Sequence, residues 1–182
     1  MVEMHLLSVN ADFRYDRIYA LGVVTTFDRF MEGYRPDQDK DSIFNGLCRA
    51  IEADPQQYRQ DVEQVQAELN HLGSVDAFLS LFDDLSEGAG GGLKGDLAAI
   101  AHNPQFKYSR LFAIGLYSLL ETLDPEYVKD SDKLGQALEK ICTTLHISKE
   151  KAEKDLEIYL SNLDKLVQAR AVMADILKAD RK

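Results

Sequence analysis

The sequence has few of the residues that usually mark a chemical site. Its 182 residues include no tryptophan, only two cysteines and only four prolines. Cys48 and Cys142 fall on predicted apolar helix faces without CxxC spacing, so we expect buried free thiols rather than a disulfide. Basic residues are outnumbered by acidic ones, 21 against 31, which gives a net charge of −10. This charge argues against nucleic acid as a partner, because nucleic-acid-binding domains carry a basic patch.

Long hydrophobic runs and strand patterns are also missing. The most apolar stretch, residues 18–31, is shorter than the roughly 20 residues that a membrane-crossing helix needs. No segment alternates apolar and polar residues as a strand would, whereas apolar residues recur at spacings of three and four. Hydrophobic residues make up 45% of the chain, enough for a proper core. The sequence therefore predicts an all-α fold, a compact multi-helix bundle.

The predicted bundle is organised around one central helix. Residues 18–31 are apolar nearly all the way round, which indicates that other helices cover every side. Residues 108–123 form a second strongly apolar helix, the natural partner of the first. Gly33 is expected to end the central helix and Pro36 to mark a corner, after which Asp39 or Asp41 starts the next helix.

Other helix boundaries follow from local signals. Residues 1–9 resemble the tail of a helix with Met4, Leu7 and Val9 facing inward, and we expect that a natural N-terminal segment is absent from the sequence. The pairs Asp54-Pro55 and Asp124-Pro125 both predict helix starts, because an N-cap residue followed by proline suits the first turn.

The last predicted helix is the longest. Ser148 caps it, and it runs from Lys149 to about Lys178 with an apolar stripe of heptad-like spacing: Leu156, Tyr159, Leu163, Leu166, Met173 and Leu177. At ~1.5 Å per residue it is about 45 Å long, longer than a small domain is wide. Its first half either packs on the domain or forms a coiled coil with a partner or a second copy. After Arg170 the helix is expected to project from the domain. We predict a globular domain over residues 1–147 and a coiled-coil-like arm over 148–182, packed on the domain at its start.

Three patterns resemble chemical sites but lack required residues. The glycine-rich stretch 86–95 contains a formal GxGxxG match, yet it follows a helix rather than a strand, so we interpret it as a mobile connector before a short helix over 97–101. Residues 37–48 begin with carboxylates at alternate positions, as a calcium-binding loop does. Ser42 and Cys48, however, stand at the positions where such a loop needs glycine and glutamate. The four histidines are far apart, without metal-ligand spacing. We therefore predict no catalytic residue, no metal, no cofactor and no enzyme.

A partner-binding surface is the remaining candidate. The polar corner over residues 33–41 presents an aromatic residue and an arginine, types that are enriched at binding hot spots, and the outer part of the final helix adds basic residues. The predicted contacts are Tyr34, Arg35, Pro36, Lys40, Arg170 and Lys178. A structural interpretation of the corner stays open beside this one, in which Pro36 shapes a turn and Arg35 pairs with a nearby acid.

The block from Met1 to Asp61 resembles the most recognisable region of a known family. The segment RIYALGVVTTFDRFMEGYRPDQDKDSIFNGLCRAI lies at its centre, and the similarity continues through KYSRLFAIGLYSLLE and the Lys-rich final helix. The family is the thylakoid formation family, also called the photosystem II biogenesis family, of cyanobacteria and chloroplasts.

This resemblance implies a non-enzymatic accessory factor in thylakoid biogenesis and in photosystem II assembly or repair. It implies association with membrane-bound FtsH protease complexes and a peripheral place on the cytoplasmic or stromal face of the thylakoid. It assigns no residue to catalysis, to a cofactor or to a partner. The alternatives are a ligand- or pigment-binding protein with an apolar cavity between the two apolar helices, an enzyme built from dispersed residues, and a coiled-coil homo-oligomer.

Overall fold

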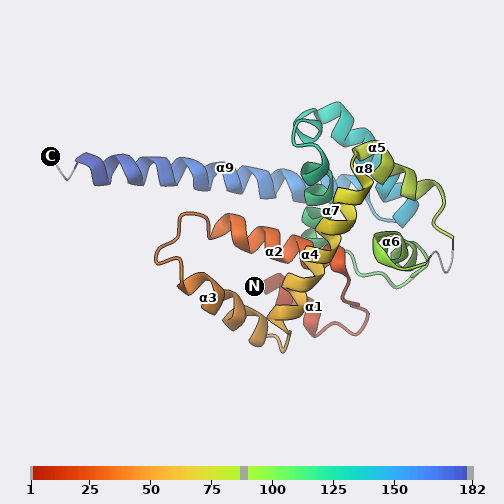
Figure 1. The fold of residues 1–182 in the computed structure, drawn as a ribbon, viewed down its shortest axis with the longest axis horizontal. Helices are drawn as coiled ribbons and strands as arrows, with labels where there is room; N and C mark the ends of the chain where they lie inside the picture. The colour runs from red at the N-terminus through yellow and green to blue at the C-terminus, as the bar shows by residue number, and fades with distance from the viewer. Residues whose placement is uncertain (1, 87–89, 180–182) are drawn as a thin grey trace.

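The fold is entirely helical over the part of the chain that the structure describes (Figure 1). This computed structural model describes residues 2–86 and 90–179, without the side chains of 174, 175 and 177–179. The α-helices are α1 Val2–Ser8, α2 Arg17–Phe30, α3 Asp39–Arg49, α4 Pro55–Leu72, α5 Val75–Ser80, α6 Gly92–Ala101, α7 Arg110–Leu123, α8 Ser131–Leu145 and α9 Lys149–Ala179. Two short 3-10 turns, Leu81–Asp83 and Tyr127–Lys129, lie between them. The predicted all-α class is confirmed.

Most helices begin where a side chain can cap them. Asp16 accepts a hydrogen bond from the backbone N–H of Tyr19 at the start of α2, and Asp54 accepts one at the start of α4. Ser148 accepts from the N–H of Lys151 at the start of α9, at 3.2 Å. These caps satisfy N–H groups that have no partner within the helix, so local sequence suffices to locate the starts.

Two predicted boundaries are wrong. The pair Asp124-Pro125 begins only the 3-10 turn, and α8 starts later because Asp130 accepts from two backbone N–H groups there. The short helix predicted from Leu97 in fact starts at Gly92, since the carboxylate of Glu68 on α4 accepts from the backbone N–H of Leu93 and caps α6 from outside. The predicted mobile connector falls partly on residues 87–89, which lie outside the described residues.

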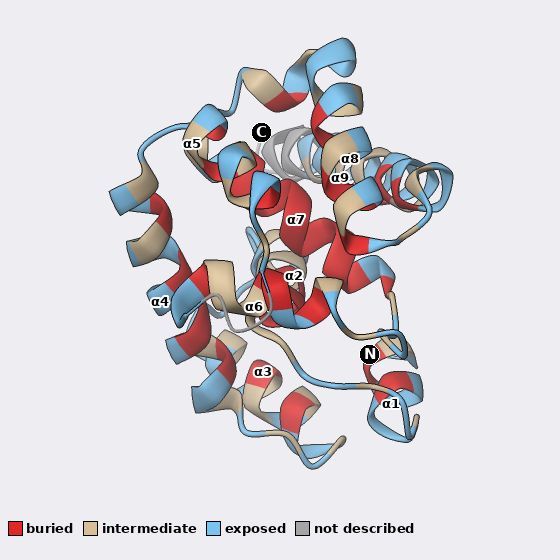
Figure 2. Ribbon diagram, turned by 90° about the vertical axis from the view of Figure 1, so that its right-hand side faces the viewer, coloured by how far each residue is buried: buried red, intermediate tan, exposed pale blue. Residues whose placement is uncertain are grey.

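The centre of the core is the crossing of α2 and α7, whose backbones touch. A Cβ atom on Gly22 would lie 1.7 Å from the carbonyl oxygen of Leu111, and one on Gly115 would lie 2.0 Å from that of Ile18. Figure 2 shows α7 buried along almost its whole length beside α2. The predicted pairing of the two apolar helices is therefore confirmed, but this close contact leaves no room at their crossing for the cavity that the ligand-binding alternative placed there.

Burial of the central helix is less complete than its composition suggested. Ile18 to Val24 are buried, but Phe27 is half-buried and Phe30 is exposed, because the last turns of α2 extend past α7. On α1, Met4 and Leu7 are buried as expected, whereas Val9 follows the end of the helix and is exposed.

The terminal helix α9 packs on α7 and α8 at its start and then runs out beyond the body of the molecule (Figure 1). Ala152, Leu156 and Tyr159 are buried, Leu163 and Leu166 are half-buried, and the apolar side chains described beyond them are exposed. The division into a domain over residues 1–147 and an arm over 148–182 stays a prediction. None of the described helices is both long and apolar enough to cross a membrane.

Candidate functional site

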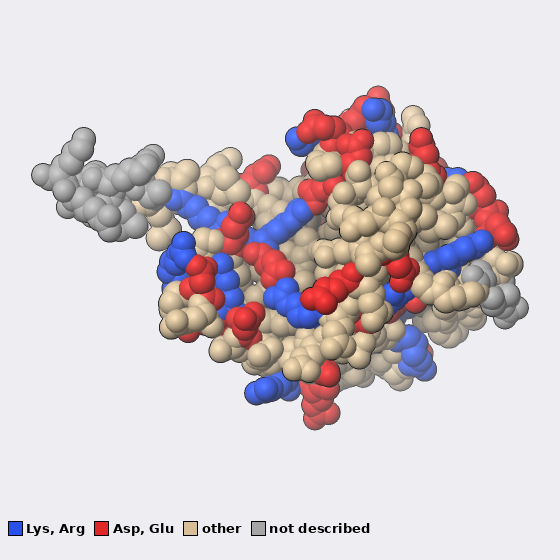
Figure 3. All heavy atoms as spheres, viewed as in Figure 1, with Lys and Arg blue, Asp and Glu red and all other residues tan. Residues whose placement is uncertain are grey.

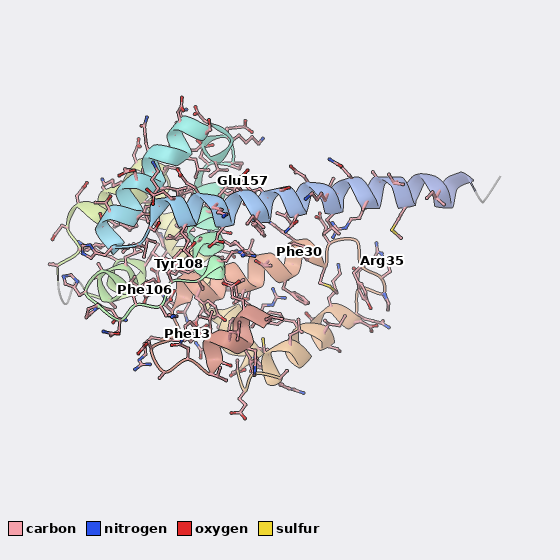
Figure 4. The ribbon with its side chains drawn as sticks, turned by 180° about the vertical axis from the view of Figure 1, so that it is seen from behind. Phe13, Phe30, Arg35, Phe106, Tyr108 and Glu157 are labelled. Atoms are coloured by element: carbon pink, nitrogen blue, oxygen red, sulfur yellow. The ribbon has the colours of Figure 1, made fainter. Side chains whose placement is uncertain are left out.

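The polar corner between α2 and α3 is held by ion pairs among its own residues. Asp37 pairs with Arg35 and, at 2.9 Å, with Lys40, and the peptide bond before Pro36 is cis. Arg35 and Tyr34 are exposed, and Figure 4 shows Arg35 on the side towards which α9 runs. The expected pairing of Arg35 with a nearby acid is therefore present, and its use in partner binding, like that of Tyr34, Pro36 and Lys40, stays a prediction.

Arg170 on α9 ties the terminal helix to this corner. Its guanidinium donates to the carbonyl oxygens of Arg29 at 3.2 Å and Phe30 at 3.0 Å, and it lies 3.4 Å from the carboxylate of Glu32. A cation at this position satisfies the terminal carbonyl groups of α2 and complements the negative end of its helix dipole. The corner and α9, more than 130 positions apart in sequence, therefore form one surface.

The surface rests on a polar junction where α2, α7 and α9 meet. Arg29 of α2 forms an ion pair with Glu121 of α7, and the rings of Phe30 and Tyr159 lie 6.5 Å apart between α2 and α9. Burial, together with the charge of Glu121, raises the pKa of Tyr117 to about 12, so this tyrosine stays neutral. Figure 3 shows acidic and basic side chains interspersed on this face below α9.

Beyond Arg170 the terminal helix presents apolar side chains to solvent. Val172, Met173 and Ile176 have exposed fractions of 59%, 63% and 55%. With Ala169 they occupy positions i, i+3, i+4 and i+7, which form one continuous patch on a helix. We call Val172, Met173 and Ile176 the outer apolar patch.

Met173 belongs to the heptad-like stripe but lies beyond Arg170, where the helix was expected to project, and its side chain is exposed. The stripe continues past the body of the domain, because the described side-chain hydrogen bonds between α9 and α2 are made by Arg170. A signal for the outer apolar patch was present in the sequence, since Val172 and Ile176 are apolar but lie outside the heptad stripe. Lys178, the last predicted contact, lies in α9, but its side chain is outside the described part.

Replacing Arg170 with alanine should loosen the outer part of α9 from the corner. We expect faster amide hydrogen exchange in α9 beyond residue 163, with a loss of no more than about 1 kcal/mol in the free energy of unfolding, because the contacts are partly exposed. Lys165→Ala is the matched control, as Lys165 is an exposed cation on the same helix. Equal exchange in the two variants would contradict the role given to Arg170.

The patterns that resembled chemical sites are used structurally. Asp37 is engaged with Arg35 and Lys40, while Asp39 and Asp41 lie in the first turn of α3. Within the described residues, no three His, Cys, Asp or Glu side chains gather to hold a metal ion. Both cysteines are buried and free, as predicted, and burial raises the pKa of Cys142 to about 11, which keeps it a thiol.

A second polar cluster joins the start of α2 to α4 and α6. Arg17 lies 2.7 Å from the carboxylate of Glu68 and 2.6 Å from that of Asp96. Asp16 lies beside Arg17 and is half-buried. Burial and, after it, the charge of Asp96 raise the pKa of Asp16 to about 7. The hydrogen bond from the backbone N–H of Tyr19 lowers this pKa but does not cancel the rise. Neither sequence pattern nor resemblance had singled out this cluster.

The raised pKa of Asp16 predicts a pH-dependent stability. Between about pH 4 and 7, Asp16 is protonated in the folded protein but ionised in the unfolded chain, where its pKa has the ordinary value of 3.8. The contribution of this group to the free energy of unfolding therefore falls as the pH rises from about 4 to 7. Asp16→Asn keeps a cap acceptor and should be more stable than the wild type by on the order of 1 kcal/mol at pH 8, but not at pH 4. Urea denaturation at both pH values tests this, and a difference that does not change with pH would contradict it.

These features define a class of protein: a helical scaffold built on the crossing of α2 and α7, with a corner held by ion pairs and a projecting terminal helix that carries exposed apolar residues. Residues 1–182 match the family model described as thylakoid formation protein. The chain belongs to the thylakoid formation protein family.

Individual relatives are similar over the whole chain. Protein Thf1 of Nostoc punctiforme is 60% identical over 182 residues, which cover 100% of this chain and 77% of that protein. Protein Thf1 of Acaryochloris marina is 52% identical, with 100% and 73% covered. A solved structure of Psb29 is 40% identical and covers 99% of this chain and 82% of its own, with a TM-score of 0.81. The likeness to Psb29 confirms the compact helical fold.

Proposed function

We propose that the protein is a non-enzymatic accessory factor in photosystem II assembly and repair that binds and modulates membrane-bound FtsH protease complexes. Its membership of the thylakoid formation protein family supports a role in thylakoid biogenesis. The further step, to FtsH and to photosystem II, rests on the family resemblance of residues 1–61. The proposal places the protein peripherally on the cytoplasmic or stromal face of the thylakoid.

The observation that carries the proposal is the outer apolar patch. Three large apolar side chains on a projecting helix are unfavourable in water and contribute nothing to the core, so they are better explained by a partner that covers them. The patch lies just beyond Arg170 and the corner with Tyr34 and Arg35. An apolar centre beside aromatic and arginine residues is typical of protein–protein interfaces.

The geometry also suits a modulator. Arg170 fixes the direction in which α9 leaves the body, so a partner bound to the outer patch would be held at a defined distance from the corner. A preformed arm binds with less loss of conformational entropy than a disordered one. Contacts of one partner with both the patch and the corner would then add to each other through effective concentration.

Affinity capture from solubilised thylakoid membranes tests the proposed function. The protein carries an affinity tag at the N-terminal end, away from the outer apolar patch, and captured proteins are identified by mass spectrometry. We expect FtsH subunits to be enriched over a mock capture with the tag alone. Capture of the intact protein without enrichment of FtsH subunits would contradict the proposal.

A further inference from the structure

A pocket of about 420 Å³ lies between α1, the start of α2 and the start of α4, on the part of the molecule away from the outer apolar patch. Its volume is within the range of small-molecule sites. Figure 4 labels Phe13, one of its walls. The pocket is lined by Met4, Ser8, Phe13, Tyr15, Tyr19, Ile51, Ala53, Asp54, Gln57 and Tyr58.

Three tyrosine rings that line this pocket pack edge to face on one another. Tyr15 and Tyr58 lie 5.1 Å apart at 74°, Tyr15 and Tyr19 lie 6.2 Å apart at 80°, and Tyr19 and Tyr58 lie 6.2 Å apart at 63°. Phe13 extends the set, with its ring 5.0 Å from that of Tyr19. We call Phe13, Tyr15, Tyr19 and Tyr58 the aromatic box. The faces of aromatic rings carry negative charge density, and cages of such rings bind quaternary ammonium groups.

A buried carboxylate adds negative charge behind the aromatic box. Asp61 is only 5% exposed and accepts hydrogen bonds from the hydroxyl of Tyr15 at 2.6 Å and from the side-chain amide of Gln57 at 2.9 Å. Both donors are neutral, and within the described residues no cationic side chain pairs with Asp61. The charge of a buried carboxylate is therefore left without a counterion, an arrangement that favours a cation nearby.

The rest of the pocket lining also carries negative and no positive charge among its described residues. Asp54 adds a second carboxylate at the rim, and none of the described lining residues is lysine, arginine or histidine. Arg14, which is close in sequence, donates instead to the carbonyl oxygens of Ala11 and Phe13. The lining therefore combines apolar surface with uncompensated negative charge.

We propose that the aromatic box binds a quaternary ammonium group, carried either by a small solute or by a trimethylated lysine side chain. A quaternary ammonium has an apolar outer shell and a positive charge, which match the rings and the carboxylates respectively. An unmodified lysine ammonium fits less well because it is compact and strongly hydrated. This site is independent of the proposed binding of FtsH.

Comparison of choline with 3,3-dimethylbutan-1-ol, a neutral molecule of the same shape, tests the charge dependence directly. Titration is followed by ligand-observed NMR and by tyrosine emission, which is not obscured because the chain has no tryptophan. We expect saturable binding of choline with a Kd on the order of 1 mM, and binding of the alcohol at least ~10-fold weaker. A parallel titration with Nα-acetyl-trimethyllysine methylamide shows which source of the group binds more tightly. Equal affinity for choline and the alcohol, or no saturable binding of either cation, would overturn the proposal.

Two variants locate the binding in the aromatic box. Tyr15→Ala removes the most accessible ring, and Asp61→Asn removes the buried charge while keeping a hydrogen-bond acceptor; each should weaken binding at least ~10-fold. Tyr34→Ala is the matched control, since Tyr34 is 40% exposed and Tyr15 is 39% exposed. Circular dichroism confirms that each variant is folded. Unchanged affinity in a folded Asp61→Asn or Tyr15→Ala protein would overturn the proposal.

Discussion

Replacing Gly22 with alanine is expected to lower the free energy of unfolding by about 3 kcal/mol or more. The added Cβ would lie 1.7 Å from the carbonyl oxygen of Leu111 and 3.0 Å from the backbone nitrogen of Gly115. Both neighbours are backbone atoms of α7, so the clash is relieved only if the two central helices move apart. Urea denaturation followed by circular dichroism measures the effect.

Gly46→Ala is the matched control for this substitution. Gly46 is also a helical glycine, but it is exposed on α3 and a Cβ there would meet nothing within 4 Å. Alanine should therefore stabilise this helix by about 0.5–1 kcal/mol. If Gly22→Ala were as stable as the wild type, α2 and α7 would not be packed backbone to backbone, and the arrangement of the core would be wrong.

Replacing the outer apolar patch with glutamine is expected to weaken FtsH binding by about 30-fold or more, which corresponds to about 2 kcal/mol. The triple variant Val172→Gln, Met173→Gln and Ile176→Gln removes the apolar surface but retains side chains that favour helices. Because the three residues are exposed, the free energy of unfolding should change by no more than about 0.5 kcal/mol. We therefore expect this variant to lose affinity for FtsH while its free energy of unfolding stays close to that of the wild type.

A second triple variant controls for the loss of any exposed apolar surface. Val2, Leu6 and Val9 are also exposed, at the opposite end of the chain. Their replacement by glutamine should leave FtsH binding unchanged. An equal loss of binding in both triple variants would indicate nonspecific hydrophobic binding rather than a specific binding surface on α9.

The parts of the fold that local chemistry determines were predictable from the sequence. Asp16, Asp54 and Ser148 cap helices with their own side chains, so the starts of α2, α4 and α9 could be located without the structure. The pairing of the two most apolar helices followed from their composition, because such helices are stable only when others cover them.

Two errors arose where distant residues decide the local structure. Glu68 caps α6 from another helix, and no signal near Gly92 indicates this. The close backbone contact at Gly22 and Gly115 leaves no space at the crossing of α2 and α7, where the ligand-binding alternative had placed a cavity.

The candidate sites were predictable only in part. The corner and the outer part of α9 were both singled out, but the sequence does not indicate that Arg170 joins them. The aromatic box was missed because Tyr15, Tyr19 and Tyr58 each fit an ordinary core or surface position. Their convergence depends on the packing of α4 against α2, which brings together residues about 40 positions apart in sequence.

We propose above all that the outer part of α9 binds an FtsH complex. The most direct test is the binding of purified FtsH complex, in detergent, to the immobilised wild-type protein and to the two glutamine triple variants. We predict that the wild type and the α1 variant bind with equal affinity and that the α9 variant binds about 30-fold more weakly or worse. A folded α9 variant that binds as tightly as the wild type, or a wild-type protein that does not bind FtsH, would contradict the claim.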